Sequence, residues 1–133
     1  MNILVWNVRG LNDLIKQKAI IGRIRDLKIN LVCFLETRVK KCNMKTIVSK
    51  HLQGWQLLHN YSKEACNGRI WCLWNGVLQV EFVDSMDQSI TCCVTYGAKK
   101  FYFSAMYGSN EGTDRKRLWM HLTSLRSSIA QYP

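Results

Sequence analysis

Two polar side chains follow short apolar runs near the start of the chain. Asn7 comes after residues 3–6, and Glu36 comes after residues 31–35. Each run is typical of a buried strand, and ligands in α/β folds bind at the carboxyl ends of such strands. Carboxylate and amide oxygens suit Mg²⁺, which is usually held by one or two carboxylates together with substrate phosphate. The spacing therefore indicates a site for one metal ion and one phosphate.

Each of the two residues also has a plainer interpretation when it is taken alone. Asn7 is then a turn residue that bonds its own backbone, and Glu36 is a surface carboxylate. A third apolar run, residues 101–106, ends at Tyr107 and opens a loop that holds Asn110. Tyr107 is either a core aromatic, the commoner case, or a hydroxyl that donates to a phosphate oxygen. Asn110 either bonds a base or a phosphate or only forms the turn.

Alternating strands and helices must position these residues. Hydrophobic periodicity predicts helices over residues 14–28, 43–53 and 114–130, and strands over residues 2–8, 30–35, 55–61, 70–74, 77–83, 89–96 and 101–106. Asn12 or Asp13 is expected to cap the first helix, and Thr113 or Asp114 to begin the last. One face of that last helix carries Leu118, Leu122, Leu125 and Ile129.

The strands after residue 55 read as an antiparallel meander. Asn75-Gly76 is a typical hairpin turn, Asn67-Gly68 is a turn, and Gly97–Lys100 predicts another hairpin. A strand-helix-strand unit, a meander and a helix describe an α/β fold with mixed, mostly antiparallel strands. No Gly-rich phosphate loop follows any strand, which argues against a doubly wound nucleotide-binding sheet.

The charge of the chain is high and unevenly distributed. The 133 residues carry a formal charge of +10, with a net +8 in residues 1–66 and +2 in residues 67–133. A solvated basic surface is the plain explanation. An excess of this size on one side nevertheless favours a polyanion, because each neutralised phosphate releases counterions. We therefore expect DNA or another nucleic acid as a partner.

The cysteines and the hydropathy exclude several classes of protein. Six cysteines form no C-x-x-C pair and have no His nearby at ligand spacing, so we expect no zinc. Four of them lie in apolar runs, where a free thiol behaves as a small hydrophobe. No segment approaches the length of a membrane span, and no secretory signal is visible. The expected setting is a reducing interior compartment, without a membrane partner.

Four motifs, in this order, resemble the endonuclease/exonuclease/phosphatase superfamily, in the branch of apurinic/apyrimidinic-type endonucleases carried by LINE-type non-LTR retrotransposons. They are W-N-V-R-G-L at residues 6–11, L-E-T at 35–37, N-G-R-I-W at 67–71 and Y-G-S-N at 107–110. The similarity spans the whole chain and is greatest to the plant-type group. It implies the DNase I-like fold, a four-layer α/β sandwich of two sheets flanked by helices.

The resemblance implies a Mg²⁺- or Mn²⁺-dependent phosphodiesterase that nicks DNA in the nucleus. Asn7 and Glu36 match the positions that bind metal and scissile phosphate, and Tyr107 matches a phosphate contact. Arg9 stands where DNA-repair relatives carry an acidic residue, so a phosphate or DNA contact is expected there instead of a second metal contact. The expected nucleic-acid contacts are Arg9, Arg38, Lys40, Lys41 and Asn110.

Other parts of the family's site have no counterpart here. The family places a Gly-Asp-[Phe/Leu]-Asn strand, a second Asp and a late Asp-His pair after the helix that matches 114–130. We therefore expect residues 1–133 to be the N-terminal half of a domain, truncated before that strand and inactive alone. A full-length relative would add the C-terminal half and a reverse transcriptase region. One sheet face would lack its partner, which would leave Trp55, Trp71 and Trp74 partly exposed.

Two alternatives to an endonuclease remain open at this stage. The chain is a nucleic-acid-binding module without catalysis, or it is a relic open reading frame whose motifs only record ancestry. Binding that falls with salt but ignores Mg²⁺ and Glu36 favours the module. Melting of low cooperativity favours the relic.

Overall fold

The computed structural model describes residues 1–62 and 70–130. Its first half contains β1 (Ile3–Asn7), α1 (Leu14–Asp26), β2 (Leu31–Leu35), α2 (Lys41–His51) and β3 (Gln56–His59). Its second half contains β4 (Ile70–Trp74), β5 (Gln79–Met86), β6 (Ser89–Tyr96), β7 (Lys99–Met106) and α3 (Gly112–Ser128). Each predicted helix and strand is present, with its ends shifted by a few residues. The predicted turn at Asn67-Gly68 lies outside the described residues.

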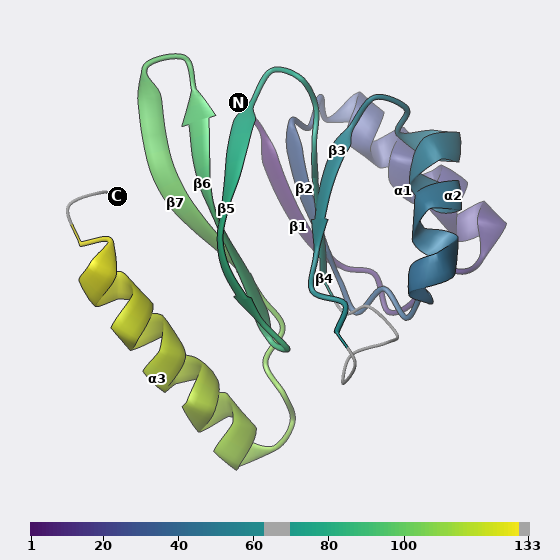
Figure 1. Cartoon of the computed structure of the whole chain (residues 1–133). Helices are drawn as coiled ribbons and strands as arrows, with labels where there is room; N and C mark the ends of the chain where they lie inside the picture. Colours follow the sequence, from purple (N-terminus) through teal and green to yellow (C-terminus); the bar gives the residue numbers. More distant parts are fainter. Residues whose placement is uncertain (63–69, 131–133) are drawn as a thin grey trace.

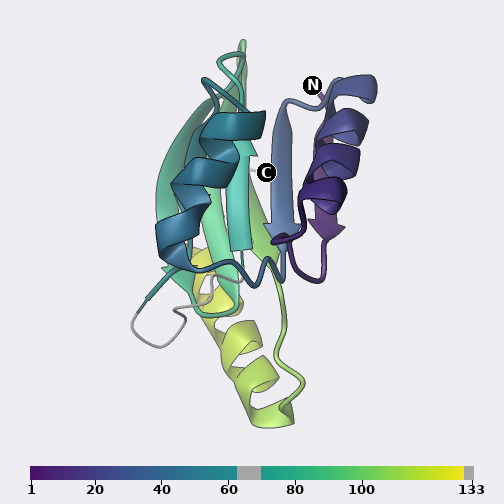
Figure 2. The ribbon, with the colours of Figure 1, turned by 90° about the vertical axis from the view of Figure 1, so that its right-hand side faces the viewer.

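The strands form two sheets that face each other. The first sheet has the order β1-β2-β4-β3, and the second has the order β5-β6-β7. Only β1 and β2 pair in parallel among the described strands; the other neighbours pair in antiparallel fashion. Helices α1 and α2 lie side by side on the outer face of the first sheet, and α3 lies on the far side of the second (Figures 1 and 2). The arrangement confirms the predicted α/β sandwich with mixed, mostly antiparallel strands.

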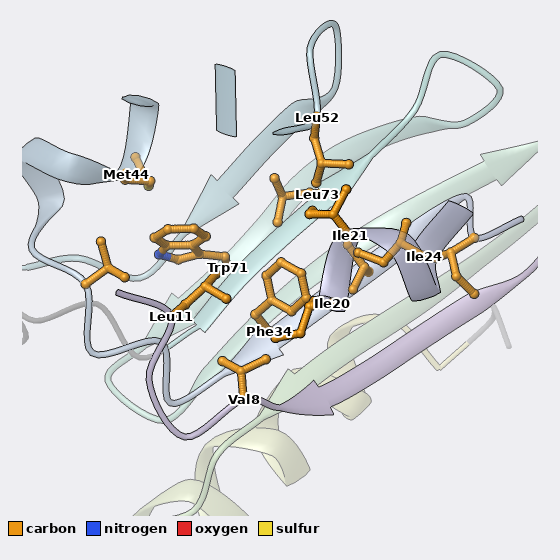
Figure 3. Close-up of a cluster of buried hydrophobic side chains, with 13 residues drawn as sticks. Val8, Leu11, Ile20, Ile21, Ile24, Phe34, Met44, Leu52, Trp71 and Leu73 are labelled. Carbon is orange, nitrogen blue, oxygen red and sulfur yellow. The ribbon is translucent and has the colours of Figure 1, made fainter. Parts of the chain in front are cut away.

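Strand β4 is buried over its whole length because both of its faces are covered. Trp71 and Leu73 point into the core beneath α1 and α2, where Phe34 and Ile24 meet them (Figure 3). The alternate residues of β4, Cys72 among them, face the second sheet. A strand covered on both faces reads as a continuous apolar run, which explains the sequence I-W-C-L-W.

A second core fills the space between the two sheets. It contains Leu31 and Trp74 from the first sheet and Cys92 and Val94 from the second. The expectation of exposed tryptophans is therefore wrong for Trp71 and Trp74, which are 1% and 4% exposed. The first sheet does not lack a partner, because the β5–β7 meander covers it. Trp55 alone is half-buried, as expected.

The predicted hairpin at Asn75-Gly76 is also wrong. The turn itself forms: the Asn75 side chain accepts from the Val77 amide at 3.1 Å, and the Asn75 carbonyl accepts from the Leu78 amide at 3.2 Å. However, β4 already pairs with β2 on one edge and β3 on the other, so no edge is left for β5. The chain therefore crosses to the second sheet, and the predicted single meander is divided between two sheets.

The helix ends agree in part with the prediction. The Asp13 carboxylate accepts from the Lys16 amide at 2.7 Å, which confirms the predicted cap of α1. Helix α3 begins at Gly112, slightly before the predicted Thr113 or Asp114, and its N-cap Glu111 makes no side-chain capping bond. On the predicted apolar face of α3, Leu118 is buried, whereas the other three side chains are half-buried. No described helix is long and apolar enough to cross a membrane.

Candidate metal and phosphate site

The carboxyl ends of β1 and β2 lie at one edge because the two strands are parallel. Asn7 pairs with Leu35 in register. The chains stay joined beyond the strands, where the Gly10 amide donates to the Glu36 carbonyl and the Leu11 amide to the Thr37 carbonyl, both at 2.8 Å. The two motifs that the sequence singled out therefore form one pair of adjoining loops.

These loops hold an unusual concentration of left-handed backbone. Arg9, Glu36 and Arg38 have φ angles of 48°, 57° and 54°, and among the described residues Lys28 is the only other non-glycine with positive φ. Such conformations are unfavourable for residues with a Cβ atom and gather at functional sites, where surrounding structure enforces them. Thr37 between them is buried, while the side chains of Glu36 and Arg38 form an ion pair with each other.

Glu36 is the centre of the site. Its Oε1 accepts a hydrogen bond from the Tyr107 hydroxyl at 2.8 Å, across 71 positions of sequence, and pairs with the Arg38 guanidinium at 3.0 Å. Within the described chain, Oε2 has no such partner. The Glu36 side chain is 18% exposed, so solvent or a ligand reaches it. The contact thus joins a side chain that follows β2 of the first sheet to one that follows β7 of the second.

The same contacts hold Glu36 in its charged form. The Tyr107 hydrogen bond is the largest influence that lowers the pKa of Glu36, and Arg38 and Arg9 lower it further against the opposing effect of burial. The result is a pKa below the ordinary value for glutamate. Glu36 is therefore an anion at neutral pH, the form in which a carboxylate binds a divalent cation.

Sequence reasoning missed the residues that hold the Glu36 loop in place. The Tyr61 hydroxyl donates to the Val39 carbonyl at 2.6 Å and accepts from the Trp71 indole at 3.1 Å. Val39 itself is fully buried. Tyr61 is the last residue of the expected strand over 55–61, and nothing in its local pattern distinguishes it from a core aromatic. The sequence also did not single out Asn60, which donates to the Asp87 carbonyl, or Gln88, whose carbonyl accepts from the Tyr107 amide.

The other predicted site residues are less closely joined to Glu36. The Asn7 side chain accepts from the Arg9 amide at 3.1 Å, which is the turn contact that the plainer interpretation expected. Asn110 is exposed, and its carbonyl accepts from Arg115 at 2.8 Å. Lys40 and Lys41 are exposed at the start of α2, next to the Glu36 loop. Arg69 of the N-G-R-I-W motif lies outside the described residues.

The available donors fit a magnesium ion better than a softer metal. No group of three or more His, Cys, Asp or Glu able to hold a metal occurs in residues 1–62 and 70–130. Mg²⁺ is typically bound by one or two carboxylates plus water and substrate phosphate. The anionic Glu36, with one oxygen unpartnered within the described chain, and the amide of Asn7 on the next strand end match that requirement.

The sequence matches no protein-family model and no curated protein. Among solved structures, the endonuclease domain of TRAS1, a telomere-specific non-LTR retrotransposon, matches with a TM-score of 0.71 and 9% identity, over 96% of this chain and 52% of that one. TDP2 of D. rerio, complexed with single-strand DNA product, matches with a TM-score of 0.64 and 11% identity, over 95% and 54%.

An AP endonuclease of Leishmania major, LMAP, matches with a TM-score of 0.60 and 16% identity, over 96% of this chain and 46% of that one. The chain thus spans about half the length of these three structures. At such identities the likeness establishes the fold alone. The fold is that of the endonuclease/exonuclease/phosphatase, or DNase I-like, proteins, which confirms the fold that the four motifs implied.

Proposed function

We propose that this chain is the N-terminal half of a Mg²⁺-dependent phosphodiesterase domain that nicks DNA, of the type found in LINE retrotransposons. The observation that carries the proposal is the contact of Tyr107 with Glu36, which joins one strand end of each sheet at an ionised carboxylate. In a full-length protein the rest of the domain and a reverse transcriptase region would follow, and the substrate would be nuclear DNA.

In this proposal Glu36 and Asn7 would hold the metal ion, which would supply Lewis-acid stabilisation of charge at the scissile phosphate. Glu36 offers Oε2 for this purpose, while Oε1 stays fixed by Tyr107 and Arg38. Backbone hydrogen bonds join the two loops and help to hold the carboxylate in place. Groups that are positioned in advance need no reorganisation during the reaction.

Arg38 and Tyr107 are the residues closest to the place where the phosphate would lie. The Arg38 side chain is 64% exposed, so its guanidinium can turn from Glu36 to a phosphate oxygen. A phenol has a single proton, and that of Tyr107 is donated to Glu36. We therefore propose that Tyr107 first orients the carboxylate, and that it donates to phosphate only when it leaves Glu36.

We further propose that the chain alone does not hydrolyse DNA. A hydrolytic site needs a base for the attacking water as well as a metal. Glu36 is engaged as a ligand, and the described residues place no cluster of carboxylates or histidines beside it. The remaining groups would come from the other half of the domain, which this chain does not cover.

A second candidate function is a nucleic-acid-binding module without catalysis. The formal charge of +10 favours it, as do the exposed Arg38, Lys40 and Lys41 around one loop. The module would bind any duplex through its phosphates, with an affinity that falls steeply as salt rises. It would need neither Mg²⁺ nor Glu36, and this separates it from the first candidate.

Nicking of supercoiled plasmid tests the proposal. We expect the purified chain to bind the plasmid in low salt but not to nick it in the presence of Mg²⁺. We expect the same of Glu36→Ala and of the matched control Glu81→Ala, which removes an exposed carboxylate on β5. Mg²⁺-dependent nicking that is lost in Glu36→Ala and kept in Glu81→Ala would prove the half-domain active. Binding that is equal in all three proteins with Mg²⁺ or with EDTA would support the module instead.

A further inference from the structure

Gln88 is a fully buried polar residue in the turn between β5 and β6, on the side of the second sheet where Tyr107 lies. Its side chain is 0% exposed. Its Nε2 donates to the Asp114 carbonyl at 2.9 Å, and its Oε1 accepts from the Ser109 amide at 2.7 Å. A buried amide is costly unless its polar atoms are paired, and here both are.

Every one of these contacts goes to the segment that follows β7. The Gln88 carbonyl also accepts from the Tyr107 amide at 2.9 Å. One residue thus binds three points of the segment between Tyr107 and Asp114. This segment leaves the sheet at Tyr107, so these bonds hold the backbone of Tyr107 and of the residues that follow it.

The turn that carries Gln88 is itself tied to the first sheet by Asn60. The Asn60 side chain accepts from the Ile70 amide at 3.0 Å and donates to the Asp87 carbonyl at 3.1 Å. Ile70 pairs in register with Leu35, the residue before Glu36. A closed circuit of contacts therefore runs from Glu36 through β2 and β4 to Asn60, on to Gln88 and Tyr107, and back to Glu36.

We propose that Gln88 is a positioning residue, which sets the Tyr107 hydroxyl against Glu36 by fixing the start of the loop after β7. Its importance for catalysis rests on the function proposed above, whereas the placement of Tyr107 does not. An apolar side chain of the same size would fill the same space. Only an amide, with a donor and an acceptor, pairs with both Ser109 and Asp114, and buried networks of this kind specify one geometry.

Carbon-13 NMR of the Tyr107 ring tests this inference without metal or DNA. The Cζ resonance of a tyrosine responds to the hydrogen bond of its hydroxyl, and Tyr107→Phe identifies the signal among the five tyrosines. In Gln88→Met, which keeps the volume and removes both bonds, we expect the Tyr107 signal to move toward its position in Glu36→Ala, where the acceptor is absent.

Thr91→Val is the matched control. Thr91 is 1% exposed and shares a hydrogen bond with Ser104 at 2.8 Å within the same sheet. Its replacement by Val therefore also removes a side-chain hydrogen bond of a buried residue, but this bond does not involve the segment after β7. The control should leave the Tyr107 signal in place. A signal that stays put in Gln88→Met, or that moves equally in Thr91→Val, would overturn the inference.

Amide exchange in the unmodified chain provides a second measurement if Gln88→Met does not fold. The Ser109 amide should exchange as slowly as the amides of β6, because Gln88 accepts from it, and rapid exchange would contradict the inference. The proposed function and the proposed role of Gln88 can be tested separately. A chain that binds no metal but shows the Tyr107 shift would refute the proposed function and leave the role of Gln88 intact.

Discussion

At the scale of single residues, Glu36 owes its properties to three neighbours. Tyr107 and Arg38 bond the same oxygen, and Arg9 adds positive charge nearby. Arg38 is two residues from Glu36, and the left-handed backbone at both positions makes this close pairing possible. The site thus combines a local contact with one from a distant strand.

Replacement of Tyr107 by Phe should raise the pKa of Glu36, because the hydroxyl is the largest influence that lowers it. A lowered pKa in the folded state stabilises the protein above the ordinary glutamate pKa, and this stability is lost as pH falls through the lowered value. Tyr107→Phe should therefore have a lower free energy of unfolding than the unmodified chain near neutral pH, and this difference should shrink as the pH falls through the lowered pKa of Glu36. Titration of carbon-13-labelled glutamate measures the pKa, with Tyr96→Phe as the exposed control. An unchanged Glu36 titration would mean that the hydrogen bond does not form in solution.

The sequence predicted Glu36 and Tyr107 as site residues but not their contact. Each follows an apolar run, and that pattern is local. The distance between them depends on how the second sheet lies on the first, which no spacing in the chain encodes. Gln88 went unnoticed for a related reason: a glutamine between two strands looks like a solvated turn residue until the segment after β7 folds over it.

At the scale of elements, the structure differs from the prediction at the turn after β4, where a hairpin was expected. The Asn-Gly pair forms a turn as predicted, yet the strands on either side belong to different sheets. Local turn chemistry decides where a chain bends, whereas strand pairing depends on which edges are still free. The run I-W-C-L-W held a useful indication, because a strand apolar on both faces is more typical of a sheet interior than of a hairpin with one wet face.

The cap of α1 offers a direct test at this scale. Asp13→Ala removes the carboxylate that accepts from the Lys16 amide, and we expect it to lower the free energy of unfolding by about 1 kcal/mol. Asp26→Ala is the control: it removes the same group at the last residue of the same helix, where a negative charge opposes the helix dipole. Urea unfolding should show a loss in the first variant and none in the second. Equal losses would mean that the cap does not contribute.

At the scale of the whole molecule, the two sheets bury each other although the chain spans only about half of the solved structures it matches. The buried Trp74 and Cys92 come from opposite sheets and meet in one cluster. From this core we expect the chain to fold on its own, and melting of low cooperativity would favour the relic instead.

The charge distribution gives a prediction for DNA binding. Lys40 and Lys41 lie next to the Glu36 loop, whereas Lys99 and Lys100 lie at the opposite end of β7 from Tyr107. Changing Lys40 and Lys41 to Gln should weaken duplex binding and reduce the slope of log affinity against log salt by about 0.9 for each phosphate that the protein no longer neutralises. Fluorescence anisotropy over a range of salt concentrations measures this. The same change at Lys99 and Lys100 should leave the slope nearly as it was, and an equal effect would show that binding is diffuse.

The proposal that Glu36 and its neighbours form a divalent-metal site can be checked by paramagnetic broadening with Mn²⁺. In the amide spectrum of the nitrogen-15-labelled chain, low Mn²⁺ should broaden the signals of residues 7–10, 36–38 and 107–109 first, and Mg²⁺ in excess should restore them. Glu36→Ala should abolish this selective broadening, while Glu81→Ala should preserve it. Broadening that begins elsewhere, or that persists in Glu36→Ala, would show that Glu36 does not bind the metal ion.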